Sequence, residues 1–137
     1  METSGIPPKS VTSLLRLDGL AVAAAAITAF AVTGGNWWIF ALLILAPDLS
    51  MLGLLLGEKT GAHVYNWAHS YTLPIVLGAA GVFGGPVTLL HIGLIWAAHI
   101  AIDRAVGYGL KYPHAIHHTH LGVMGKARKA ERVANAG

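Results

Sequence analysis

The sequence predicts an all-α fold, a four-helix transmembrane bundle with short loops and with both termini in the cytoplasm (N-in/C-in). Three observations indicate this fold. Hydrophobic residues make up 55% of the 137 residues and charged residues only 11%, whereas soluble domains carry about 25% charged residues. Four apolar stretches have roughly the 20 residues with which a helix crosses a bilayer. All nine lysines and arginines fall on one side of the resulting topology, and such a bias marks the cytoplasmic side.

The chain divides into a cytoplasmic N-terminal segment, four helices in one transmembrane domain, and a His-rich turn with a basic cytoplasmic tail. The N-terminal segment is expected at residues 1–12 and the His-rich turn with its tail at 111–137. The transmembrane domain is expected at 13–110, with its four helices at about 13–33, 37–57, 63–84 and 86–110. The linkers between the helices are only a few residues long, so consecutive helices must be antiparallel neighbours. Only a helical bundle satisfies the backbone of such segments in lipid.

Local sequence features support the first helix, the start of the second and the end of the fourth. The stretch 13–33 lacks a convincing small-residue cleavage site, so we expect a retained helix rather than a signal peptide. Trp37 and Trp38 open the second helix at the outer interface, where tryptophan is enriched. Pro113 ends the fourth helical run, because proline lacks an N–H donor and restricts the residue before it.

Ionisable residues inside the expected helices are candidates for function, because they are costly in lipid. A rise of about 1.5 Å per residue places five of them in one layer in the inner half of the bilayer, and it places His91 near the outer surface. The five are Asp18, Asp48, His69, His99 and Asp103. If a site forms, the side chains of Asp48, His69, His99 and Asp103 should converge within about 4–6 Å of a common point, the range over which charges shift each other's pKa.

The spacing of these residues strengthens the hypothesis of a site. His99 and Asp103 are four residues apart and share a helix face, and an imidazole beside a carboxylate is a common metal-ligand or acid–base pair. Pro47 should kink the second helix and free a carbonyl near Asp48, and Pro74 would do the same in the third. The structural alternative is that the His99–Asp103 pair only holds helices together.

Several motifs resemble a bacterial family of small integral membrane proteins, the domain of unknown function 4260 family (DUF4260). They are APDLSMLGLLLG, YNWAHSYTLP, IWAAHIAIDRAVGYGLKYP and THLG. The resemblance covers roughly residues 12 to 125 and implies a four-helix membrane protein, with no established activity. The residues that match its motifs are Asp48, Asn66, His69, His99, Asp103, Arg104, Gly107, Tyr108, Gly109, Lys111, Tyr112, Pro113, Thr119 and His120.

The chain also has a distant similarity to the membrane-bound metal-dependent hydrolases described as LexA-binding. The order P-D, then H-S, then H-x-x-x-D carries this similarity. Those proteins have P-D-x-D in the first motif, whereas this chain reads PDLS, so Ser50 stands in the place of the second Asp. The similarity implies a divalent metal ion, with one ligand fewer in the first motif.

The candidate metal ligands are Asp48, His69, His99, Asp103 and His120. Imidazole and carboxylate ligands together suit Zn, Mn or Fe. No catalytic residue is assigned, because the chain has no cysteine, no G-x-S-x-G and no P-loop. His114, His117 and His118 stay unassigned, and a solvated polar turn explains them equally well.

Three functions remain open, and whether the protein is an enzyme stays undecided. The favoured one is a non-enzymatic or accessory membrane protein whose Asp/His layer locks the bundle. The alternatives are a metal-dependent hydrolase acting on a lipid or lipid-linked phosphate and a carrier of protons or metal ions. The expected surroundings are the lipid bilayer of the bacterial inner membrane, with a homo-oligomer or a membrane partner protein. Nucleic-acid binding is not expected, because the basic tail holds few charges and no interleaved aromatic residues.

Overall fold

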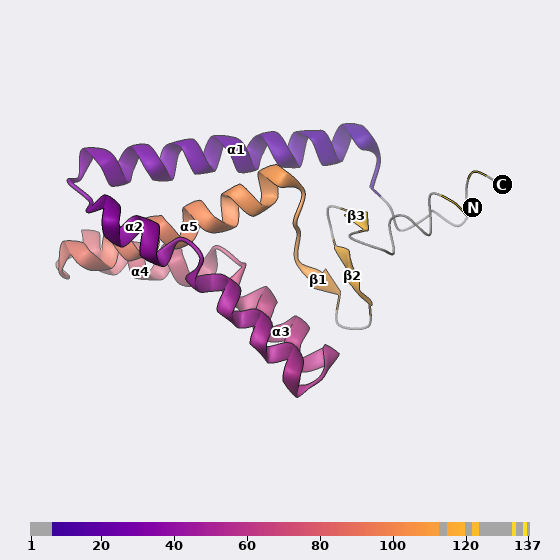
Figure 1. Ribbon diagram of the computed structural model, residues 1–137. Helices are drawn as coiled ribbons and strands as arrows, with labels where there is room; N and C mark the ends of the chain where they lie inside the picture. Colours follow the sequence, from indigo (N-terminus) through magenta and orange to yellow (C-terminus); the bar gives the residue numbers. More distant parts are fainter. Residues whose placement is uncertain (1–6, 113–114, 120–121, 124–132, 134–135, 137) are drawn as a thin grey trace.

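The protein is helical, with a short sheet near its C-terminal end (Figure 1). The computed structural model describes residues 7–112, 115–119, 122–123, 133 and 136. Its elements are, in chain order, α1 (Lys9–Val32), α2 (Trp37–Leu43), the 3-10 helix η1 (Ala46–Leu56), α3 (Glu58–Ala68), α4 (Thr72–Val82), α5 (Val87–Val106), β1 (Lys111–Tyr112), β2 (Ala115–Thr119) and β3 (Gly122–Val123).

Helix α5 is the centre of the fold, since α1 and α4 both pack against it and η1 and α3 pair with each other beside it (Figure 1). Its Ile95, Ala98 and Ile100 are almost fully buried. Close approach depends on glycine: a Cβ on Gly19 of α1 would lie 2.7 Å from a Cβ of α5, and one on Gly93 of α5 would lie 2.7 Å from a carbonyl oxygen at the start of α4. Small residues at such contacts are typical of packed membrane helices.

Three helices of the described chain are long and apolar enough to cross a membrane: Lys9–Val32, Trp37–Leu56 (α2 with η1) and Val87–Val106. The third expected segment is instead divided into α3 and α4, of 11 residues each. A helix of 11 residues is about 16 Å long, roughly half of the hydrocarbon core, so neither α3 nor α4 is long enough to cross it alone. The apolar helices and their exposed leucines make this a membrane protein.

The break between α2 and η1 follows from Pro47. Proline has no N–H to bond back to the preceding turn, and the N–H of Asp48 donates to Leu45 O at 3.1 Å in the tighter 3-10 pattern. The carbonyl of Ile44 therefore loses the N–H that an α-helix would supply. The freed carbonyl that the sequence predicts near Asp48 is present: Ile44 O accepts a hydrogen bond from His99 instead.

A second break separates α3 from α4 at residues 69–71, just before Pro74 in the first turn of α4. Proline is tolerated there, because the N–H groups of a first turn have no helical acceptor. The interruption leaves the carbonyls of Ala68 and His69 without the amide donors of a continuous helix. Broken helices persist in a membrane only where neighbouring groups satisfy such carbonyls.

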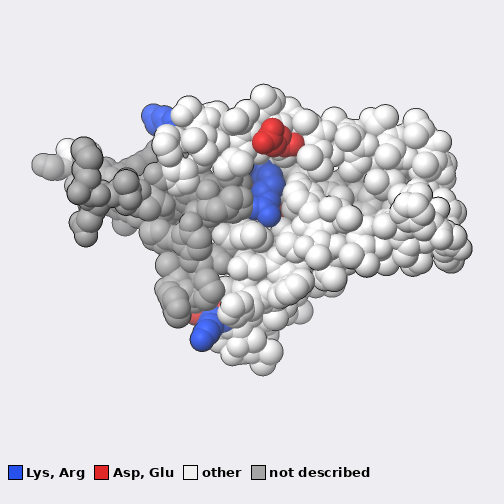
Figure 2. Space-filling model, turned by 180° about the vertical axis from the view of Figure 1, so that it is seen from behind, with Lys and Arg blue, Asp and Glu red and all other residues white. Residues whose placement is uncertain are grey.

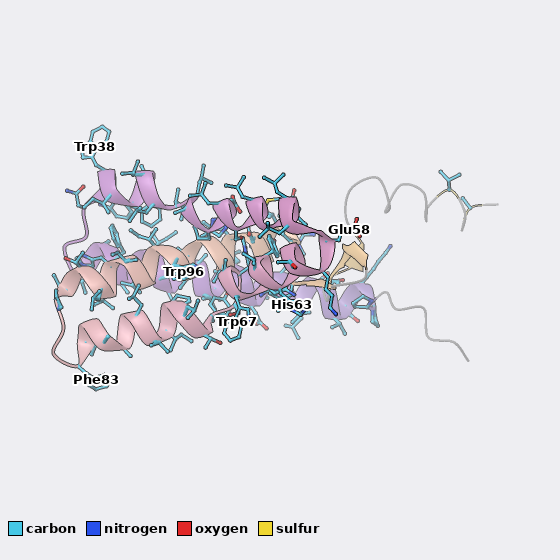
Figure 3. The ribbon with its side chains drawn as sticks, turned by 90° about the horizontal axis from the view of Figure 1, so that it is seen from below. Trp38, Glu58, His63, Trp67, Phe83 and Trp96 are labelled. Atoms are coloured by element: carbon cyan, nitrogen blue, oxygen red, sulfur yellow. The ribbon has the colours of Figure 1, made fainter. Side chains whose placement is uncertain are left out.

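The two ends of the bundle differ in charge. Residues 19–47 and 60–102 contain no Asp, Glu, Lys or Arg, and the right-hand part of the face in Figure 2 shows no charged side chain. Trp38 and Phe83 lie at one end of the bundle and Glu58 at the other (Figure 3). The start of α1 and the exit from α5 lie at the same end as Glu58 (Figures 1 and 3). That this end faces the cytoplasm remains a prediction from the sequence.

The C-terminal part of the described chain differs from the expectation of a simple turn. Helix α5 ends at Val106 rather than near 110, because Gly107 has a φ of +100°, a left-handed conformation that ends helices. The N–H of Tyr108 donates to Asp103 O at 2.7 Å and closes this cap. The strands β1, β2 and β3 then form an antiparallel sheet with Lys111 opposite Thr119 and His118 opposite Val123. The sequence did not predict this sheet, because each of its strands is too short to carry a periodic pattern.

Candidate metal centre

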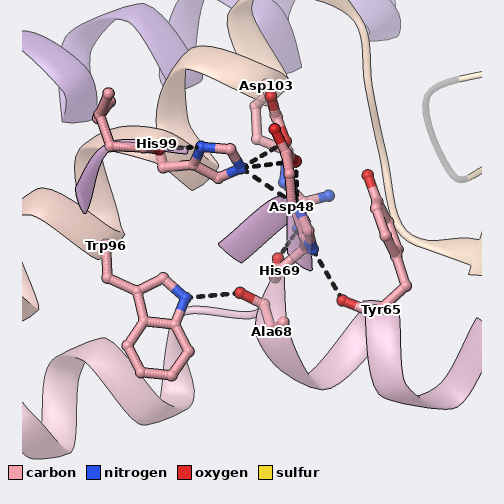
Figure 4. A network of polar contacts seen from close by, with 9 residues as sticks. Asp48, Tyr65, Ala68, His69, Trp96, His99 and Asp103 are labelled. Atoms are coloured by element: carbon pink, nitrogen blue, oxygen red, sulfur yellow. Dashed lines mark hydrogen bonds and ion pairs between the residues drawn. The ribbon is translucent and has the colours of Figure 1, made fainter. Parts of the chain in front are cut away.

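Four ionisable side chains from three elements meet in the interior of the bundle (Figure 4). We call this group the Asp/His cluster; it consists of Asp48 from η1, His69 at the end of α3, and His99 and Asp103 from α5. One potential ligand atom of each residue lies within 4.8 Å of those of the other three. This convergence meets the geometric criterion that the sequence set, and the cluster could hold a metal ion.

The spacing within the cluster is close to that of a tetrahedral metal site. His99 Nε2 lies 3.2 Å from both His69 Nε2 and Asp48 Oδ1, and 3.3 Å from Asp103 Oδ2. His69 Nε2 lies 3.4 Å from each of the same two carboxylate oxygens. A tetrahedral ion with bonds of about 2.0–2.1 Å holds its ligand atoms about 3.3–3.4 Å apart. These five distances match five of the six edges of such a tetrahedron, and the sixth, between the Asp48 and Asp103 carboxylates, is within 4.8 Å.

Hydrogen bonds to backbone carbonyls fix both imidazole rings. His69 Nδ1 donates to Tyr65 O at 2.9 Å, and His99 Nδ1 donates to Ile44 O at 2.6 Å. Because a carbonyl oxygen only accepts, each Nδ1 must carry the proton, and in the neutral rings each Nε2 then presents a lone pair. The cluster consequently brings together four acceptor atoms, an arrangement that a metal ion or an added proton would stabilise.

Donors on α5 satisfy the carbonyls that the two helix breaks leave free. Besides His99, which bonds to Ile44 O, Trp96 Nε1 donates to Ala68 O at 2.6 Å and an Arg104 guanidinium nitrogen donates to His69 O at 3.0 Å. Tyr65 stacks on the His69 ring, with centroids 3.8 Å apart and an interplanar angle of 13°. Helix α5 therefore supplies two cluster residues and also holds the two breaks of the backbone in place beside them.

Burial divides the cluster into a closed and an open side. The imidazoles of His69 and His99 belong to residues only 3% and 4% exposed, whereas the side chain of Asp103 is 21% exposed and that of Asp48 is 44% exposed. A ligand from outside the bundle would therefore approach the cluster at Asp48.

Four of the five candidate ligands come together as expected, and the fifth, His120, lies outside the described residues. Asp18 was expected in the same layer, but it lies on an exposed part of α1 and is not a member of the cluster. His91 is separate, as predicted: its Nε2 lies 3.1 Å from Thr33 Oγ1 and 3.2 Å from Thr33 O at the other end of the bundle.

The sequence reasoning missed Tyr65 and Trp96, which position His69. Trp96 acts through the backbone carbonyl of Ala68, which only the break after α3 makes available, so no pairing of side-chain types predicts its role. Tyr65 acts through its own carbonyl and by stacking on the His69 ring. A weak signal existed in the spacing, since Tyr65 precedes His69 by one helical turn and Trp96 precedes His99 by three residues.

Residues 12–124, including the whole Asp/His cluster, match the sequence family described as Domain of unknown function (DUF4260). The chain belongs to this family. This match confirms the resemblance to DUF4260 that the motifs predicted. The family description assigns no activity. No curated protein and no solved structure shows a significant match to the chain. The similarity to LexA-binding hydrolases therefore stays a prediction.

Proposed function

We propose that this protein is a membrane metalloprotein that binds one divalent transition-metal ion in the Asp/His cluster. One observation carries the proposal: among four acceptor atoms, whose two imidazoles have their protons on the opposite nitrogen, five of the six separations are those of tetrahedral ligands. Zn²⁺ fits best, because it takes nitrogen and oxygen ligands in a tetrahedron, and Mn or Fe are the alternatives among metals that accept the same ligands.

The surroundings of the cluster support the proposal. Histidines that bind a metal usually donate their other N–H to a carbonyl or carboxylate, which fixes the ring and its tautomer; His69 and His99 both do so. Hydrogen bonds alone would lock the bundle only if one imidazole takes up a second proton, because the converging atoms are otherwise acceptors. The accessory role favoured from the sequence is compatible with a metal, because an ion held by η1, α3 and α5 would join the two broken helices to the continuous one.

A hydrolytic role is the second candidate, and the exposure of Asp48 favours it. The ion would supply Lewis-acid activation of a water and of an ester or phosphoryl oxygen. A substrate could reach this edge from the bilayer, because Asp48 belongs to a segment whose neighbouring leucines are exposed on the outside of the bundle. The proposal includes the bacterial inner membrane as the location and the cytoplasm as the side of both termini, on the strength of the positive-charge bias.

Metal analysis of detergent-purified protein tests the proposal. We expect about one zinc ion per chain after reconstitution with Zn²⁺ and removal of excess metal, and we expect its loss in His99→Ala. His91→Ala is the matched control, because His91 is also a helical histidine with hydrogen bonds but lies outside the cluster. A monodisperse, helical wild-type protein that retains no Zn, Mn or Fe would refute the proposal, as would a His99→Ala variant that retains as much metal as the wild type.

A further inference from the structure

The helices η1 and α3, which we call the hairpin (residues 46–68), pack mainly on each other. The chain turns back at Gly57 between them, and a Cβ on Gly61 of α3 would lie 2.7 Å from the Cα of Leu54 in η1. Close approaches of η1 to α5, and of α3 to α4 and β1, are sparse by comparison. Every residue of η1 is at least partly exposed, and Figure 1 shows the hairpin diverging from α5 towards its tip. The hairpin is therefore attached to the rest of the bundle mainly at its base.

The base of the hairpin is incompletely packed against α5. A cavity of about 270 Å³ lies between them, and its walls include Ala46 and Pro47 of η1, Ala68 of α3, and Ile95 and Trp96 of α5. Protein interiors are otherwise close-packed, and the atoms around a void lose their dispersion contacts on that side. Apolar packing on α5 consequently contributes little to holding the hairpin in its position.

Hydrogen bonds fix the two ends of the hairpin but not its tip. Side chains of α5 donate three of them to carbonyls at the two backbone breaks, where the chain enters and leaves the hairpin. Lys59, near the tip, precedes His69 by ten residues, which is about 15 Å along a helix. A small rotation about the two breaks would therefore displace the tip much more than the base.

The Asp/His cluster joins the hairpin to α5 at this base. Asp48 belongs to η1 and His69 ends α3, whereas His99 and Asp103 belong to α5. An ion among them would attract both carboxylates. Without it the carboxylate oxygens of Asp48 and Asp103, which lie within 4.8 Å of each other, would repel each other more strongly than they would in water. Asp48 can move outwards to relieve this repulsion, because its side chain is 44% exposed.

We propose that metal occupancy of the Asp/His cluster sets the position of the hairpin. With the ion bound, the hairpin is held beside α5; without it, the hairpin rotates about the two breaks and its tip moves away from α5. The inference rests on the proposed function, because the ion itself makes the connection. Through this hinge, metal binding in the interior changes the shape of the end of the bundle at which Glu58 lies (Figure 3).

Double electron–electron resonance between pairs of spin labels tests the hinge. The sequence has no cysteine, so labels on introduced cysteines report only the chosen sites. Lys59→Cys with Leu17→Cys measures the hairpin against α1, and Ile75→Cys with Leu17→Cys measures α4 against α1 as the matched control; all three residues are exposed. In nanodiscs with zinc we expect a narrow distribution of Leu17–Lys59 distances. Chelation should broaden it and lengthen its mean by several ångströms, and the Leu17–Ile75 distribution should not change.

A variant of the cluster shows whether the ion acts through these ligands. Asp103→Ala removes one ligand and leaves all three hydrogen bonds at the backbone breaks in place. At a zinc concentration that saturates the wild type, its Leu17–Lys59 distribution should lose most of the response to zinc. A response equal to that of the wild type would overturn the hinge, because the ion would then act elsewhere.

Metal analysis of the same samples separates the two proposals. If the wild type binds zinc and releases it to the chelator while the Leu17–Lys59 distances stay the same, the hinge is overturned and the metal centre stands. An equal shift in the Leu17–Ile75 pair would also overturn the hinge, since the whole bundle would then respond. A folded wild type that binds no metal would refute the metal centre, and the hinge with it.

Discussion

The substitution Asp48→Asn has opposite consequences for a metal centre and for a hydrogen-bonded cluster. Asp48 Oδ1 lies 3.2 Å from His99 Nε2 and 3.4 Å from His69 Nε2. If a metal lies among these atoms, the amide removes one anionic ligand and weakens binding. If no metal binds, the amide N–H₂ of Asn can donate to one of the two lone pairs, and the protein should be as stable as the wild type or more so.

The magnitude follows from linkage. At free zinc about 100 times its Kd, binding stabilises the wild type by about 2.7 kcal/mol. A variant that binds about 100-fold more weakly would gain about 0.4 kcal/mol under the same conditions. The zinc-dependent part of the free energy of unfolding should therefore fall by about 2.3 kcal/mol in Asp48→Asn, and in the presence of a chelator the variant should equal or exceed the wild type.

Denaturant unfolding in detergent micelles, followed by circular dichroism with zinc and with chelator, measures this difference. Asp18→Asn is the matched control, because it is the same substitution on an exposed residue outside the cluster; its zinc-dependent stabilisation should equal that of the wild type. The reasoning is refuted if zinc does not stabilise the wild type, or if Asp48→Asn keeps the full stabilisation.

Three further predictions concern the supports of the site, the packing and the orientation. Trp96→Phe leaves Ala68 O without its donor, which should lower stability by about 1–3 kcal/mol and weaken zinc binding in a titration while the stoichiometry stays the same; unchanged affinity would contradict it. Gly19→Ala places a Cβ 2.7 Å from a Cβ of α5, so it should destabilise by about 1–3 kcal/mol in the same unfolding assay, whereas Gly78→Ala, whose nearest contact is 3.9 Å, should not. Because the described chain and the full sequence have no cysteine, Lys59→Cys reports orientation: an impermeant maleimide should label it only in opened cells, and labelling of intact cells would reverse the predicted topology.

Local chemistry explains what could be predicted in advance. The membrane character follows from composition, and the carbonyl freed near Asp48 follows from the missing N–H of Pro47. The shared face of His99 and Asp103 follows from helical periodicity. Each of these properties depends on residues close together in the chain, so a single sequence contains it in full.

The depth of a residue along its helix also follows from the local sequence. The side of the helix that faces the interior of the bundle does not, and Asp18 and Asp48 show the difference. The rise per residue places Asp18 in the same layer as Asp48, yet only Asp48 faces the cluster, because packing on α5 decides which side of each helix points inwards. The break at residues 69–71 likewise turns the chain so that His69 enters the cluster.

The sequence by itself determined that this is a membrane protein with apolar helical segments and which residues are costly in lipid, and it placed Asp48, His69, His99 and Asp103 among the candidates for one site. Only the tertiary structure decided that five of the six separations between their acceptor atoms are 3.2–3.4 Å and that both Nδ1 protons are directed to backbone carbonyls. The physical reason is that these contacts join residues 21 to 55 positions apart in the sequence. They form only when side chains of α5 donate hydrogen bonds to the carbonyls that the two helix breaks leave without amide donors.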